Sequence, residues 1–246
     1  MIKGGKAKSS KVKGNKSKGK KKAAKAQKAR GREELGLRKL VAATALAMSR
    51  SGLSPGRSGN VSARFADGML ITPTGLVYEN IGPKDIVFVA GDGSVPGKQR
   101  KPSTEWQFHL AAYKARPDMN AVVHTHSLHA VVLACAGRSI PAFHYMVAVS
   151  GNSDIPVLPY ATFGSDLLAS NVARGLADRQ ACLMAHHGAI AIGKSLPEAL
   201  ELAHEVEILA EQYTKVLALG PPAVLPEEEI QVVLEKFKNY GPNAKT

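Results

Sequence analysis

The sequence predicts an α/β protein of the α+β type, in which a central, largely antiparallel β-sheet is flanked by helices in a single domain. Several short segments alternate apolar and polar residues and are separated by turn residues, which is typical of neighbouring antiparallel strands. Segments with helical periodicity lie between them and again near the end of the chain. No internal repeat is found, so residues 34–246 are expected to form one domain.

The first half of the domain begins with a helix and continues with strands. A helix is expected from about Glu34, where apolar side chains recur at three- and four-residue steps, to a glycine at residue 52. The strands that alternation and turn residues predict are 60–65, 68–73, 85–91 and 120–127.

The second half mixes helices with extended segments. Residues 155–164 are expected to be extended, and residues 181–193 to form one or two strands. A capping box at Ser195 and Glu198 predicts the start of a long helix that ends near Leu219. Further helices are expected at 102–117, 128–137, 166–176 and 226–240.

Basic residues are concentrated at the N-terminus. The chain has 33 Lys and Arg against 20 Asp and Glu, but 14 of the basic residues lie in residues 1–32, which contain no acidic residue. Since large apolar side chains are scarce there, we expect residues 1–33 to be a disordered tail on a nearly neutral domain, residues 34–246. The segment resembles neither a secretory signal nor an organelle transit peptide. It suits a solubilising arm, an arm with non-specific polyanion contact, or a Lys-rich nuclear targeting signal.

The cysteines and the hydropathy indicate a reducing, aqueous setting. Cys135 and Cys182 both lie in apolar runs, which suits small buried side chains better than a disulfide framework. No stretch of about 18 apolar residues is present, so we expect no membrane span. A cytoplasmic protein with no membrane contact is the expectation.

Five of the eight histidines lie in two apolar-flanked segments, residues 124–129 and 186–187. On a strand, His124 and His126 would point to the same face and form a pair of metal ligands. Adjacent strand residues point to opposite faces, so one of His186 and His187 would join the pair, and the spacing does not decide which. Three imidazoles would suit zinc with an open position for a substrate, whereas the alternative is a set of hydrogen-bonded structural histidines. The remaining histidines are expected to be structural or supporting groups: His109, His129, His144 and His204.

Seven short motifs occur in an order that is informative. They are GNVS, TPTG, PSTEW, HTHS, FHYM, YATFG and HHG. In this order the chain resembles the class II aldolase/adducin family over essentially all of residues 34–241. The nearest resemblance within the family is to its aldolases that act on ketose 1-phosphates such as L-fuculose 1-phosphate.

The resemblance implies a metal centre and two catalytic residues. It makes His124, His126 and His187 ligands of one Zn²⁺ per subunit, and it adds Glu105 as a carboxylate that binds the metal and moves a proton. It also makes Tyr145 a catalytic residue that reaches the site of a neighbouring subunit. A homotetramer with active sites at subunit interfaces is implied.

The resemblance also implies a substrate pocket. Phe163 would line the aldehyde end, and Tyr240 would close over the substrate from the C-terminal tail. Small residues with hydroxyl or amide donors and accessible backbone N–H groups suit a phosphomonoester, and two of them would stand at a helix N-terminus. The phosphate-binding residues implied are Gly59, Asn60, Thr74, Gly75, Ser103 and Thr104.

The expected activity is reversible cleavage of L-fuculose 1-phosphate to dihydroxyacetone phosphate and L-lactaldehyde. Zinc acting as a Lewis acid makes a Schiff-base lysine unnecessary. Alternative substrates are 5-deoxyribulose 1-phosphate and ribulose 1-phosphate, and alternative family activities are an epimerase and a dehydratase. An adducin-like interaction module is the non-enzyme alternative, which has no need for three histidines and Glu105.

Overall fold

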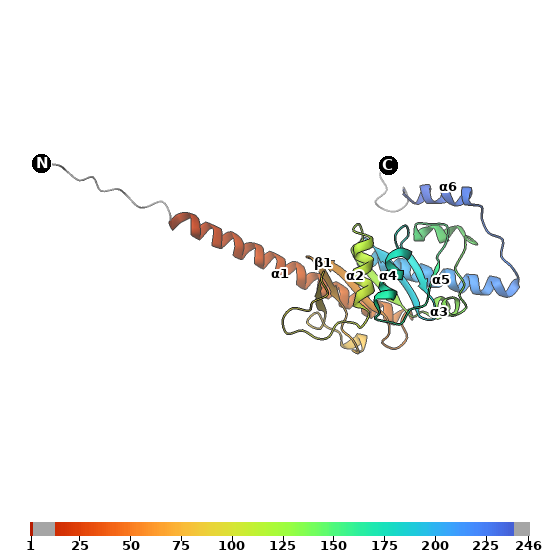
Figure 1. Ribbon diagram of the computed structural model, residues 1–246, viewed down its shortest axis with the longest axis horizontal. Coiled ribbons are helices and arrows are strands. Elements are labelled where there is room, and N and C mark those ends of the chain that lie inside the picture. Colours follow the sequence, from red (N-terminus) through yellow and green to blue (C-terminus); the bar gives the residue numbers. More distant parts are fainter. Residues whose placement is uncertain (2–12, 239–246) are drawn as a thin grey trace. The chain divides into compact units, whose positions relative to one another are not determined.

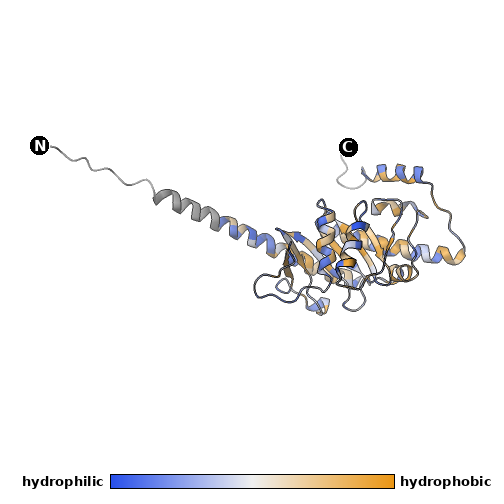
Figure 2. Ribbon diagram, viewed as in Figure 1, coloured by the Kyte–Doolittle hydropathy of each residue, from blue (hydrophilic) through white to orange (hydrophobic). Residues whose placement is uncertain are grey.

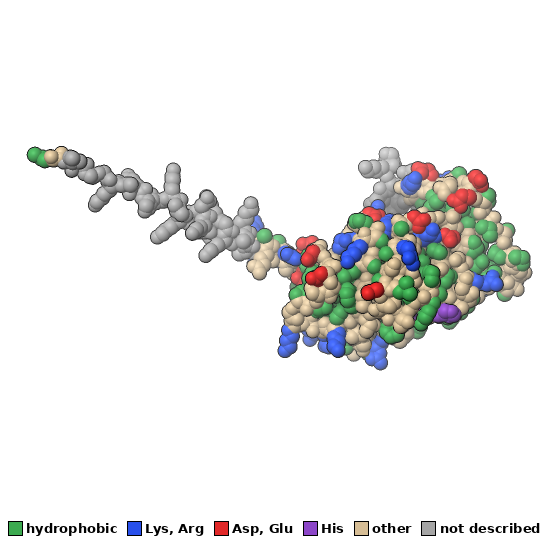
Figure 3. Space-filling model, viewed as in Figure 1, with side chains coloured by type: hydrophobic (Ala, Val, Ile, Leu, Met, Phe, Trp, Pro, Cys, Tyr) green, Lys and Arg blue, Asp and Glu red, His purple; other side chains and the backbone are tan. Residues whose placement is uncertain are grey.

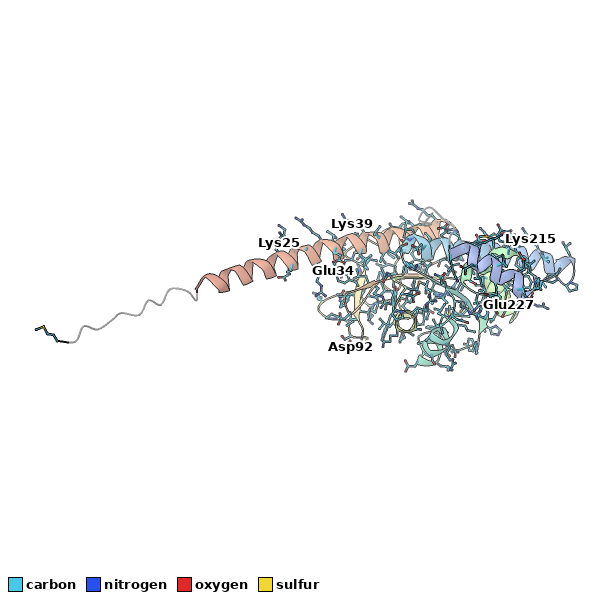
Figure 4. All side chains as sticks on the ribbon, turned by 90° about the horizontal axis from the view of Figure 1, so that it is seen from above. Lys25, Glu34, Lys39, Asp92, Lys215 and Glu227 are labelled. Atoms are coloured by element: carbon cyan, nitrogen blue, oxygen red, sulfur yellow. The ribbon has the colours of Figure 1, made fainter. Side chains whose placement is uncertain are left out.

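Helix α1 (Lys13–Arg50) opens the structure. The computed structural model describes residue 1 and residues 13–238, and the chain divides into two compact units, residues 1–37 and 38–246. The structure has helix over residues 13–33, where composition predicted disorder and where the helix was expected to begin only near Glu34. Lys and Ala are favourable helix formers, and extending a helix beyond turns that are already fixed costs little. Lys25 and Lys39 extend outward from this helix (Figure 4).

In the described part of the second unit, seven strands form one mixed sheet in the order β3-β2-β1-β4-β7-β6-β5. Neighbouring strands are antiparallel except for the parallel pair β5 and β6, so the predicted largely antiparallel sheet is confirmed. The strands are β1 (Asn60–Phe65), β2 (Gly68–Ile71), β3 (Val87–Ala90), β4 (Ala121–Thr125), β5 (Val157–Leu158), β6 (Ala181–Met184) and β7 (Gly188–Gly193).

Helices cover both faces of this sheet (Figure 1). Helices α2 and α4 pack against each other on one face, and α3 and α5 pack against each other on the opposite face. The hydroxyl of Ser195 accepts a hydrogen bond from the Glu198 N–H, as the predicted capping box requires. The helices are α2 (Trp106–Ala115), α3 (Leu128–Cys135), α4 (Asp166–Gly175), α5 (Leu196–Leu219) and α6 (Glu227–Lys238), with short 3₁₀ turns at Tyr78–Asn80 and Tyr145–Ser150.

The core lies on the two faces of the central strands. Figure 2 colours much of the sheet orange, which marks hydrophobic residues. Every residue of β4, β6 and β7 is buried, because helices cover both faces. Basic and acidic side chains are intermingled on the face of residues 38–238 that Figure 3 shows. None of the helices in the described part of the chain combines the length and apolar character that a membrane span requires.

The register of the central strands brings three chain segments to one edge of the sheet. His124, near the end of β4, pairs with Asn60 at the start of β1 and with Ile190 near the start of β7. Because β4 runs antiparallel to both neighbours, its last residues lie beside their first residues. The polar residues of β1 and β4 and those of the β6–β7 turn therefore meet at this edge.

Candidate active site

Four side chains from three parts of the fold converge at this edge of the sheet. Strand β4 presents His124 and, directly after its end, His126. The turn between β6 and β7 supplies His187, and Glu105 is the N-cap residue of α2. Their potential ligand atoms all lie within 4.8 Å of one another.

The imidazoles and the carboxylate are arranged around a common centre. The ring centroids of His124, His126 and His187 lie 4.8–4.9 Å apart, with interplanar angles of 70–82°. His124 Nε2 is 3.0 Å from His126 Nε2 and 3.3 Å from Glu105 Oε2. Glu105 Oε1 is 2.9 Å from His187 Nε2.

The protonation states favour cation binding. The Nδ1–H of His124 donates to the Ala189 carbonyl at 2.8 Å, which directs Nε2 toward the centre. Burial, with the nearby His124 and His187, lowers the pKa of His126 to about 3, so this imidazole is neutral at physiological pH. Burial would raise the pKa of Glu105, but His124 and His187 outweigh it and hold the carboxyl pKa well below its usual range.

The β6–β7 turn explains how adjacent histidines separate. His186 has a φ of 54°, in the left-handed region that non-glycine residues seldom adopt, so the pair lies in a tight turn rather than on the strand expected from sequence. A Cβ on Gly188 would lie 2.2 Å from the Thr125 carbonyl oxygen, so only glycine lets β7 begin this close to β4. His187 consequently faces the cluster, and His186 packs edge-on against Tyr160, with ring centroids 5.9 Å apart.

The donor set fits a divalent metal. The Nε2 atoms of His124 and His126 lie 3.0 Å apart, and neutral imidazoles can exchange this contact for lone pairs directed at one shared cation. Three imidazoles and one carboxylate are N and O ligands of the kind zinc takes in catalytic sites. The cluster His124, His126, His187 and Glu105 could therefore hold such an ion.

A cavity of about 340 Å³ opens beside the cluster. Its wall includes Glu105, His126 and His187, and it also includes the exposed aromatic side chain of Phe163. All six residues that the family resemblance assigned to a phosphate line it: Gly59, Asn60, Thr74, Gly75, Ser103 and Thr104.

The polar groups available to a phosphate differ from the expectation in two ways. The backbone N–H groups of Gly59, Thr74 and Ser103 already donate within the protein, to Ser54 Oγ, the Lys101 carbonyl and the Thr72 carbonyl. Helix α2 begins at Trp106, so Ser103 and Thr104 precede it instead of forming its first turn. The side-chain hydroxyls, more than these N–H groups, remain as donors.

The cavity wall also includes residues that were not predicted to bind substrate, among them Arg57 and Tyr160, and it includes His186, the histidine that does not join the cluster. Arg57 adds a fixed positive charge, and its guanidinium donates to the Gly75 carbonyl at 3.0 Å, which holds it beside the hydroxyl residues. Its position two residues before the Gly59-Asn60 pair was the available signal, because a cation beside small polar residues is what a phosphate site needs.

Two of the expected residues lie elsewhere. Tyr145 begins a 3₁₀ turn, is 50% exposed, stacks on His144 with ring centroids 4.8 Å apart, and does not line the cavity of its own chain. Tyr240 lies outside the described residues. The structure thus brings together the four metal-cluster residues, the six small polar residues and Phe163.

Comparison with known proteins identifies the family. Residues 39–214 match the model of the class II aldolase and adducin N-terminal domain. The chain is 52% identical over 206 residues to L-fuculose phosphate aldolase of Escherichia coli (strain K12), covering 83% of this chain and 95% of that protein. It is 49% identical over 211 residues to 5-methylthioribulose-1-phosphate/5-deoxyribulose-1-phosphate aldolase of Rhodospirillum rubrum, covering 86% and 95%.

Solved structures agree with this result. An L-fuculose 1-phosphate aldolase superposes with a TM-score of 0.80 at 37% identity, covering 82% of this chain and 96% of that one. The L-fuculose-1-phosphate aldolase of Thermus thermophilus superposes with a TM-score of 0.65 at 27% identity, covering 76% and 98%. The sheet, the cluster at its edge and these matches lead to one conclusion: this chain belongs to the class II aldolase and adducin family.

Proposed function

We propose that this protein is a zinc-dependent aldolase that reversibly cleaves L-fuculose 1-phosphate to dihydroxyacetone phosphate and L-lactaldehyde. Its enzyme class, a class II aldehyde-lyase for ketose phosphates, follows from the family and from its named aldolase relatives. The observation that carries the proposal is the cluster of Glu105 with three histidines, which opens into a cavity lined by hydroxyls and Arg57.

The metal would be held by His124, His126 and His187, with Glu105 as a carboxylate beside it. When bound, zinc supplies a Lewis acid that stabilises the negative charge developed on the dihydroxyacetone phosphate portion during cleavage. The hydrogen bond from His124 to Ala189 fixes the ring so that Nε2 faces the ion.

The phosphate would occupy the other half of the cavity. Arg57 supplies positive charge there, and the hydroxyls of Thr74, Ser103 and Thr104 supply donors. Since this group is remote from the bond that breaks, its binding energy orients the sugar for reaction. The cavity volume of about 340 Å³ suits a small phosphorylated sugar.

Two proton transfers complete the reaction. Cleavage of the C3–C4 bond removes the proton of the C4 hydroxyl, leaves the C4 fragment as an aldehyde, and requires a proton at C3 of the other fragment. We assign the C3 proton to Glu105, which lies beside the metal ligands in the cavity wall. The C4 oxygen is assigned to Tyr145 of a neighbouring subunit, because its exposed ring does not reach the cavity of its own chain. We further propose, from the resemblance to the aldolases of the family, a homotetramer with shared sites that acts in the cytoplasm.

A second substrate class is favoured by two observations. The relative that is 49% identical is named for 5-methylthioribulose 1-phosphate and 5-deoxyribulose 1-phosphate. Tyr160 and Phe163 are 59% and 64% exposed at the cavity wall and offer apolar surface to an aldehyde that lacks the hydroxyl of lactaldehyde, such as the acetaldehyde released from 5-deoxyribulose 1-phosphate. Cleavage of 5-deoxyribulose 1-phosphate is accordingly the alternative activity.

The test is release of dihydroxyacetone phosphate from L-fuculose 1-phosphate before chelation, after chelation, and after zinc is restored. We expect release that chelation abolishes and zinc restores. The same assay with 5-deoxyribulose 1-phosphate, 5-methylthioribulose 1-phosphate and ribulose 1-phosphate compares kcat/KM across substrates. A higher value for any of them would move the substrate assignment, and a zinc-loaded protein that cleaves none would overturn the aldolase proposal in favour of a family epimerase or dehydratase. A protein that neither binds metal nor turns over substrate would favour an adducin-like interaction module.

A further inference from the structure

Five buried polar side chains between helix α2 and strand β1 form a continuous series of hydrogen bonds, which we call the polar chain. Its members alternate between helix and strand in the order Glu105, Asn60, His109, Ser62, Tyr113. The helix members recur every four residues and the strand members every two, so each set lies on one face of its element. All five are between 0% and 6% exposed.

The contacts of the polar chain are short and complete. Asn60 Nδ2 lies 2.8 Å from Glu105 Oε2, and His109 Nε2 lies 2.5 Å from Asn60 Oδ1. Ser62 Oγ lies 2.7 Å from His109 Nδ1 and 2.8 Å from the Tyr113 hydroxyl. Each polar group in the series therefore has a partner away from water.

The charge on Glu105 sets the direction of every bond in the series. A carboxylate only accepts, so the Asn60 amide must donate to it and must present Oδ1 to His109. His109 must then donate from Nε2, and its Nδ1 accepts from the Ser62 hydroxyl. The Ser62 oxygen in turn accepts from Tyr113. All donors point toward Glu105.

His109 is held in the state that this direction requires. Its ring is fully buried and stacks on Phe108, with centroids 4.8 Å apart. Burial, with the nearby His124, lowers the pKa of His109 to about 3, so the ring is neutral and carries one N–H. A neutral ring with its hydrogen on Nε2 leaves Nδ1 free to accept from Ser62.

We infer that His109 is a positioning residue for Glu105: through the Asn60 amide it fixes the carboxylate, with Oε2 toward Asn60 and Oε1 toward His187. The inference rests on the proposed role of Glu105 as the carboxylate that works beside the metal. Without the His109 N–H, the Asn60 amide is held in this orientation only from its Nδ2 side, by Glu105 and by a long 3.5 Å contact with the Ser58 carbonyl, and turning it over would present its oxygen to Glu105, which repels the carboxylate. The sequence expectation for His109 was a structural or supporting role, and the polar chain gives it a specific one.

The kinetic test compares His109→Leu with His109→Gln. Leucine removes both nitrogens, whereas glutamine retains an amide N–H that can reach Asn60. We expect His109→Leu to lower kcat about 10- to 100-fold, with KM within about twofold of wild type, as for other groups that orient metal-site residues. His109→Gln should recover most of kcat. Equal losses in the two variants, or a rise in KM alone, would overturn the inference.

A control separates positioning from packing. Leu110 is the buried neighbour of His109 on α2 and belongs to the apolar core. Leu110→Ala should lower the midpoint of thermal unfolding while leaving kcat of the folded protein unchanged. If Leu110→Ala lowers kcat as much as His109→Leu, the effect comes from packing and the inference fails.

Two measurements do not depend on turnover. Nitrogen-15 chemical shifts of the His109 ring should show a neutral imidazole protonated at Nε2, in both metal-free and zinc-loaded protein. Competition with a chromophoric chelator should show about tenfold or more weaker zinc binding in His109→Leu than in wild type. A hydrogen on Nδ1, together with unchanged zinc affinity, would overturn the inference even if the enzyme is active. Failure of wild type to cleave any ketose phosphate would instead count against the proposed function, with these two readouts still deciding the polar chain.

Discussion

The carboxylate of Glu207 on helix α5 caps the N-terminus of helix α3 at His129. Glu207 Oε1 accepts from the His129 backbone N–H at 2.9 Å and lies 2.8 Å from its Nδ1, while Oε2 accepts from the Ala130 N–H at 3.0 Å. Helix α3 starts two residues after His126. A side chain from a distant helix thus fixes the segment that follows a metal-cluster histidine, in agreement with the structural or supporting role predicted for His129.

Replacing this cap should lower stability. We expect Glu207→Ala to lower the free energy of unfolding of the metal-free protein by about 1 kcal/mol, as loss of other helix caps does. Glu211→Ala is the matched control, because Glu211 lies one turn further on α5 and makes only an exposed ion pair with Lys215. Urea unfolding followed by circular dichroism measures the free energy of unfolding of both variants. Equal losses in Glu207→Ala and Glu211→Ala would mean that the cap contributes nothing beyond an exposed ion pair.

Removing the metal should lower both activity and stability. A ligand that binds only the folded state adds about 4 kcal/mol when present at 1,000 times its Kd, so zinc should raise the midpoint of thermal unfolding. His126→Asn should lose most of this zinc-dependent rise, while His204→Asn, outside the cluster on α5, should keep it. A zinc response that survives His126→Asn would place the ion elsewhere.

Arg57 should contribute to phosphate recognition. A lost charge-assisted hydrogen bond costs about 1.5–3 kcal/mol, so Arg57→Gln should raise KM for the phosphorylated sugar about tenfold or more. Steady-state kinetics with Arg138→Gln as an exposed control outside the cavity wall checks the assignment. A fall in kcat with KM unchanged would contradict a role in ground-state phosphate binding.

Tyr145 and Glu105 should act from different subunits. When inactive Tyr145→Phe and Glu105→Gln proteins are mixed, some oligomers will contain sites with both wild-type residues, and activity should return. Each variant mixed with itself is the control. Absence of activity in oligomers whose mixing is proven by mass spectrometry would place both residues in the site of one chain.

The basic N-terminal segment should act independently of catalysis. Deleting residues 1–32 removes 14 Lys and Arg and should abolish salt-sensitive retention on heparin without changing kcat. A variant with the same segment in scrambled order should elute with the full chain, since the expected contact depends on charge alone. Identical elution of the full and shortened proteins would remove polyanion contact from consideration.

The sequence predicted the elements better than their relations. Alternation and turn residues identified β1 to β4, because their side chains follow the period of a half-buried or buried sheet. Strand register could not be read in this way, and register is what places Asn60 beside His124. The polar chain could not be predicted from the sequence for the same reason, since Asn60 and His109 come into contact only when β1 and α2 lie side by side.

Local conformation caused the other differences. The prediction that one of His186 and His187 would join the pair agrees with the structure, but the expected strand geometry was wrong. The left-handed conformation of His186 depends on the close pairing of β6 with β7, which no local propensity encodes. Helix α1 begins earlier than expected because Lys and Ala favour helix even in a segment with few apolar side chains to bury.

The placement of the site has a consequence for how this enzyme can change. His124 stands on a central strand with neighbours hydrogen-bonded on both sides, whereas Arg57, Tyr160 and Phe163 stand on connecting segments outside the named strands and helices. Substitutions at Arg57 and Phe163 leave the strand pairing that holds His124 in place, whereas Tyr160 also packs against His186 in the β6–β7 turn. Under the proposed function, the part of the cavity wall that would contact the aldehyde is separate from the strand that would hold the metal, so a library of variants at Phe163 should change which acceptor aldehydes are used for synthesis while zinc binding stays constant.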